Sequence, residues 1–67
     1  MMELPNKSLL RPEEVAAYFD VSSTSIYRWI DHGLLVAEKY NRMLRIRRDS
    51  VISLQERARK RVEDRYG

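Results

Sequence analysis

The feature that most constrains this chain is the spacing of its apolar residues over the stretch that begins at Pro12. Counted from Pro12, they fall at positions four, five, eight, ten, fifteen and eighteen: Val15, Ala16, Phe19, Val21, Ile26 and Trp29. Steps of three and four residues predict helices, here over residues 12–19 and 23–32. Asp20 lies between them and tolerates the left-handed backbone conformation. Two short helices joined by a sharp turn are therefore expected, with Ala16 small enough to allow a close crossing.

Residues at the helix ends support these limits. Pro12 suits the first turn of a helix, where its missing N–H costs nothing. Ser22 is a good N-cap for the second helix. Gly33 suits the left-handed position that ends it.

The second helix has a polar outer face that buries nothing. Ile26, Trp29 and Ile30 are expected to point inward, with Trp29 in the core. The outward positions are Ser23, Thr24, Tyr27, Arg28 and Asp31. Small hydroxyl side chains at a helix N-terminus let the backbone come close to a phosphate. An arginine can bond a guanine edge with two hydrogen bonds or clamp a phosphate. This face predicts binding to nucleic acid.

A period of two follows the helices. Leu44 and Ile46 alternate with Met43, Arg45 and Arg47, which predicts a strand with one packed face and one basic face. With the apolar run before it, this strand predicts a two-stranded hairpin over about residues 35–47. Its turn, at residues 41–42, lacks the glycine that favours the tightest hairpin turns.

The two ends of the chain differ in character. Residues 1–8 are expected to form a flexible N-terminal arm, with Leu9 and Leu10 tucking onto a domain over residues 9–56. A last helix is expected after a cap at Asp49 or Ser50. Residues 57–67 are mostly charged and are expected to form a helical extension. Its cations between residues 57 and 61 either form a solvated face or touch phosphate.

Composition excludes several classes of function. The 67 residues include no cysteine and one histidine, so neither a disulfide nor a zinc cluster is expected. The sequence contains no nucleophile–base pair and no phosphate loop. We therefore expect no enzymatic activity, no cofactor and no small-molecule substrate. Without an apolar run of about 20 residues or a signal peptide, a cytoplasmic, nucleoid-associated protein with no membrane contact is expected.

The positive charge is concentrated in one segment. Residues 38–48 carry five cations against one glutamate, whereas the whole chain has a net charge of +3. Such focusing points to a polyanionic partner more strongly than a high isoelectric point does.

The chain resembles the small winged-helix domains of the excisionase type, which are relatives of the MerR regulator DNA-binding domain. The resemblance covers residues 9–56, and its most specific pieces are "PEEVA", "SIYRWI", Gly33 and "LRIRR". It implies a mainly α fold with a small β-hairpin: a winged helix-turn-helix with a two-stranded wing and a C-terminal helix. It places the second helix in the major groove of double-stranded DNA and the wing on the backbone or in the minor groove.

The resemblance also assigns the contact residues. In the second helix they are Ser23, Thr24, Tyr27 and Arg28. In the wing they are Lys39, Arg42, Arg45 and Arg47. The turn "NRM" at residues 41–43 departs from the Gly-Gly-Arg that is typical of the family, and Asp20 replaces a common turn glycine.

We therefore expect sequence-specific DNA binding by an excisionase-like recombination factor or a MerR-like transcriptional regulator. A single module covers less than about 1,000 Å² of its own surface. Tight binding is thus expected to need repeated sites, a second copy, or a recombinase or transcription partner held by the C-terminal helix. The alternative is a protein–protein interaction adaptor on the same scaffold, without DNA binding. The wing arginines would then only solubilise an exposed strand.

Overall fold

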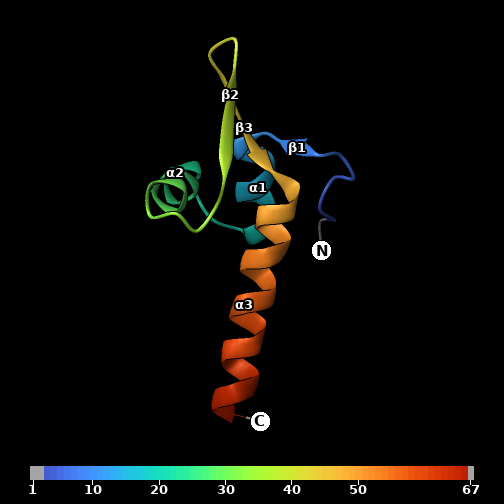
Figure 1. The fold of residues 1–67 in the computed structure, drawn as a ribbon, viewed down its shortest axis with the longest axis vertical. Coiled ribbons are helices and arrows are strands. Elements are labelled where there is room, and N and C mark those ends of the chain that lie inside the picture. The colour runs from blue at the N-terminus through green and yellow to red at the C-terminus, as the bar shows by residue number, and fades with distance from the viewer. Residues whose placement is uncertain (1–2, 67) are drawn as a thin grey trace.

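The fold is a small mainly α domain with a three-stranded sheet, given by a computed structural model that describes residues 3–66, with side chains to residue 62. The elements are β1 (Leu9–Leu10), α1 (Pro12–Phe19), α2 (Ser23–Asp31), β2 (Ala37–Tyr40), β3 (Met43–Arg47) and α3 (Arg48–Tyr66). Figure 1 shows the β2–β3 hairpin and α3 leaving the body in opposite directions, with α2 to one side between them. This arrangement confirms the predicted winged helix-turn-helix.

The first two helices and their turn agree with the sequence prediction. The main-chain N–H of Arg11 donates to Glu14 Oε1 at 2.8 Å, which satisfies one free donor at the start of α1. Asp20 adopts the left-handed conformation with φ 57° and ψ 48°. The hydroxyl of Ser22 accepts from the N–H of Ser25 and caps α2. Gly33 follows α2 with φ 75°.

The sheet has one strand more than the predicted hairpin. All neighbours are antiparallel, in the order β1-β3-β2. Leu9 and Leu10 were expected to tuck onto the domain, and they do so as a strand paired with Ile46 and Arg47. A two-residue strand is too short to show a period in sequence.

The segment before β1 forms no helix or strand over residues 3–8. Lys7 Nζ lies 3.0 Å from Glu14 Oε1, and Arg48 Nε donates to the carbonyl of Pro5 at 2.9 Å. Residues 1, 2 and 67, which belong to the predicted arm and extension, lie outside the described residues. The flexibility of the arm stays a prediction.

The hairpin turn is made without glycine. Asn41 and Arg42 have φ angles of 48° and 70°. Two positive φ angles are typical of a type I′ turn, whose twist matches that of the paired strands. Asparagine tolerates this conformation, whereas an arginine in it costs about 1–2 kcal/mol.

The prediction of a cap at Asp49 or Ser50 is wrong. β3 runs directly into α3, which begins at Arg48, so both residues lie in the first turn of the helix. Ser50 instead ties the helix start to the wing, because its hydroxyl donates to the carbonyl of Arg47 at 2.7 Å and accepts from the N–H of Val36 at 3.1 Å.

The core draws one fully buried side chain from each of five elements: Leu10, Val15, Ile26, Ile46 and Val51. Full burial of such a side chain contributes about 1.5–3 kcal/mol. Trp29 packs edge-on against Phe19, with ring centroids 5.4 Å apart. The inward face of α2 is therefore packed against α1 and the shared core, which fixes its outward face as well.

Candidate nucleic-acid interface

The outward face of α2 carries all four residues predicted for this helix. Ser23, Thr24, Tyr27 and Arg28 are exposed, and Tyr27 keeps 48% of its surface accessible. None of them makes a side-chain hydrogen bond or ion pair within the described part of the chain. The cap uses other hydroxyls: Ser22 Oγ and Ser25 Oγ lie 3.3 Å apart. The helix therefore presents two free hydroxyls at its N-terminal end, followed one turn later by a phenol and a guanidinium.

Two of the four predicted wing cations are equally free. Lys39 and Arg42 are exposed, and neither side chain makes a hydrogen bond or ion pair with any residue from 3 to 62. Arg42 lies in the turn at the far end of the hairpin, which Figure 1 shows projecting well beyond the helices.

Arg45 is engaged with its own strand. Its Nη1 donates to the carbonyl of Leu44 at 2.9 Å, and its Nη2 lies 3.5 Å from Met43 Sδ. The N–H of Arg47 donates to the carbonyl of Val36, just before β2, at 2.9 Å. Main-chain groups alternate in direction along a strand, so those of Leu44 point to the opposite edge, beyond the end of the two-residue β1. The half-buried Arg45 thus covers an open strand edge, which proteins commonly protect with a charged side chain.

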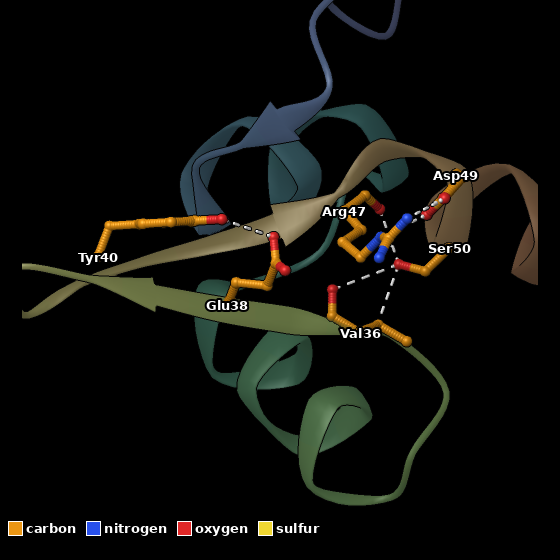
Figure 2. A network of polar contacts seen from close by, with 6 residues as sticks. All are labelled: Val36, Glu38, Tyr40, Arg47, Asp49 and Ser50. Carbon is orange, nitrogen blue, oxygen red and sulfur yellow. Dashed lines mark hydrogen bonds and ion pairs between the residues drawn. The ribbon is translucent and has the colours of Figure 1, made fainter.

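Arg47 is held by Asp49 two residues later (Figure 2). Its Nε and Nη2 donate to the two carboxylate oxygens at 3.2 and 2.8 Å. This bond lowers the pKa of Asp49 and raises the pKa of Arg47. Such a two-pronged pair is the strongest geometry available to arginine and carboxylate.

The strand register divides the wing cations between two faces. Glu38 is opposite Arg45, whereas Lys39 is opposite Leu44, so Lys39 lies on the face that packs against the helices. Figure 2 shows Glu38 and Arg47 on the other face, which we call the outer sheet face. There the hydroxyl of Tyr40 donates to Glu38 Oε2 at 3.1 Å, which raises the pKa of Tyr40.

The outer sheet face is nearly balanced in charge and partly apolar. Glu38 and Asp49 stand beside Arg45 and Arg47, and three large apolar side chains are about half exposed there: Val36, Tyr40 and Met43. A balanced surface of this kind does not attract a polyanion as strongly as the free cations of α2 and the turn.

Among residues 3–62, whose side chains are described, no three or more histidine, cysteine or acidic side chains form a group that could hold a metal ion. Over residues 3–66, every helix is too short or too polar to cross a membrane.

A helix pair with a tight turn, flanked by a β-hairpin wing, defines the winged helix-turn-helix class. The chain matches a family model described as a helix-turn-helix domain over residues 9–59. It therefore belongs to this excisionase-like family of small helix-turn-helix DNA-binding domains. Searches of curated proteins and of solved structures found no match.

Proposed function

We propose that the protein binds double-stranded DNA in a sequence-specific manner, with α2 in the major groove. The observation that carries this proposal is the outward face of α2, where the side chains of Ser23, Thr24, Tyr27 and Arg28 are exposed and have no partner among the described residues. The guanidinium and the hydroxyls on this face are therefore available to a ligand. A helix of this kind is the element that the major groove admits.

The residues of α2 are proposed to make two kinds of contact, with backbone phosphates and with base edges. Ser23 and Thr24 lie where main-chain N–H groups and the helix dipole favour a phosphate. Arg28 is one turn further along, where its guanidinium hydrogen-bonds a base edge. Guanine is the preferred base, because it can accept two hydrogen bonds from one guanidinium. Tyr27 packs on a thymine methyl or donates to a phosphate.

The wing contributes chiefly through its free cations. Lys39 and Arg42 neutralise backbone phosphates and release counterions, and Arg42 enters the minor groove if the turn lies over it. Arg45 and Arg47 contribute less, because each must first give up the partner that it already holds. This ranking refines the four-residue wing site predicted from sequence.

In the cell, we propose that this binding serves excisionase-like recombination or MerR-like transcriptional regulation in the nucleoid. A partner protein or a second copy would dock on the apolar stripe of α3. This stripe runs on from buried Val51 through Leu54 and Ala58 to Val62, which is 56% exposed. A second binding module would convert modest affinity into tight binding.

A protein–protein adaptor is the second candidate function. The observation that favours it is the outer sheet face, where Val36, Tyr40 and Met43 each expose about half of their surface. An adaptor would use this face and would leave α2 free.

A titration with labelled duplexes separates the two candidates. A site selected from a random pool and a scrambled version of it are each titrated at 50 and 200 mM salt. DNA-specific binding predicts preference for the selected site and an affinity that falls steeply with salt. Weak binding with no preference in either salt would favour the adaptor.

A further inference from the structure

We infer that the distal half of α3 is a second DNA clamp, whose cations Arg57, Lys60 and Arg61 bind the sugar–phosphate backbone on the side of α2 opposite the wing. This inference rests on the proposed DNA binding by α2. It adds a third contact region, which neither the helix-turn-helix nor the wing supplies.

The first observation is the position of Arg57. Its Nη2 lies 3.5 Å from the carbonyl of Leu34, in the loop that follows α2. Earlier on the same side of α3, Ser50 bonds the main chain of Val36 in that loop. This side of α3 therefore faces the C-terminal end of α2.

The second observation is helical spacing. Residues three and four positions after Arg57 lie on the same side of a helix, and these are Lys60 and Arg61. All three are exposed, and Arg61 has no partner among the described side chains. The apolar stripe that ends in Ala58 and Val62 lies on an adjacent side. Arg61, three positions after Ala58, lies at the margin of this stripe, whereas Lys60 lies farthest from it, so the cations and the proposed protein-docking stripe are neighbours that meet at Arg61.

The third observation is the layout of the molecule. In Figure 1 the wing extends away from α2 in one direction and α3 in the other, so that the two flank the helix. When α2 enters a groove, elements on its two flanks meet the phosphates on either side of that groove. The longest dimension of the chain is 45 Å, and α3 continues for five residues, about 7.5 Å, beyond Arg61. The span from the wing turn to Arg61 therefore corresponds to about 11 base pairs at 3.4 Å per pair, so the clamp predicts a contact of about one helical turn.

The test compares variants by the slope of log affinity against log salt, measured by fluorescence anisotropy on the selected duplex. Each phosphate contact contributes about 0.9 to this slope. Lys60→Ala combined with Arg61→Ala removes the two clamp cations that hold no partner among the described side chains. It should reduce the magnitude of the slope by about 1.8, so that raising the salt from 50 to 200 mM costs the double variant about 12-fold less affinity than it costs the wild type. Arg61→Ala alone should give about half of this change in slope.

Arg59→Ala is the matched control, because it removes the same charge from about the opposite side of α3 and should leave the slope unchanged. Circular dichroism checks that each variant is folded, and Arg61 is exposed on the surface of α3. A wild-type slope in the double variant, with Arg42→Ala still reducing it, would overturn the clamp and leave the proposed function standing. Wild-type protein that binds no duplex would overturn both.

Discussion

The outward face of α2 and the wing were both predicted to bind DNA, yet they use their charged residues differently. Every predicted side chain of α2 lacks a partner among the described residues, and all four share one side of the helix. In the wing, Arg45 bonds the carbonyl of Leu44 and Arg47 bonds Asp49, whereas the side chains of Lys39 and Arg42 have no partner in residues 3–62.

The charge of a side chain and its availability to a ligand are therefore separate properties. The main-chain groups of a helix hydrogen-bond to one another within the helix, so its outer side chains are not needed to satisfy them. An edge strand exposes N–H and C=O groups that nearby side chains must cover. In a two-stranded wing, some arginines therefore bond groups of the hairpin itself, and others remain available to bind a ligand.

The largest expected effect is on the reading residue of α2. Arg28→Ala should cost about 1–3 kcal/mol of discrimination, a 5- to 150-fold fall in the ratio of affinities for selected and scrambled duplexes. Arg28→Lys is the control, because it keeps the charge but lacks the two-pronged fork. It should retain the salt dependence and still lose preference. An unchanged ratio in Arg28→Ala would remove this residue from the reading role.

The next effect contrasts a free cation of the wing with a paired one. Arg42→Ala should lower the slope of log affinity against log salt by about 0.9, and Arg47→Ala by clearly less. The reason is that Arg47 already has Asp49 as its counter-charge. Equal slopes in the two variants would show that pairing in the free protein does not decide which arginine meets DNA.

A third prediction separates stability from binding at the turn. Glycine accepts the left-handed conformation of residue 42 without strain, so Arg42→Gly should raise the free energy of unfolding by about 1 kcal/mol. That corresponds to a rise in Tm of about 4–8 °C in a domain of this size. Arg42→Ala lacks the cation but keeps the strain. The two variants should bind DNA equally and differ in Tm, and equal melting would contradict the strain.

The smallest effect concerns pH. The hydrogen bonds from Arg47 lower the pKa of Asp49 in the folded protein. The stabilisation from this pair is thus present at neutral pH and is lost as the pH falls through that lowered pKa. Thermal melts of wild type and Asp49→Ala should differ at pH 7 and converge in acid. A difference that stays constant between pH 7 and pH 3 would exclude the ion pair as its source.

Sequence predicted the helices well because their signals are local and redundant. The apolar period, Pro12, the Ser22 cap and Gly33 all agree on where α1 and α2 begin and end. The outward face of α2 then follows by elimination. The confirmed hairpin follows from the alternation around Leu44.

Sequence could not predict the features that depend on partners far along the chain or across a junction. β1 is a strand only because β3 passes beside it. The start of α3 was misplaced because an unbroken passage from strand to helix needs no cap residue. The bond from Arg47 to Asp49 spans that junction, where neither the strand period nor the helix period applies.

DNA binding through α2 is tested by titrating ¹⁵N-labelled protein with the selected duplex and following the chemical shift of each residue. Insertion of α2 into the groove predicts the largest changes at Ser23, Thr24, Arg28 and the turn at Arg42, with small changes on the outer sheet face. Changes concentrated at Val36, Tyr40 and Met43, with α2 silent, would contradict it.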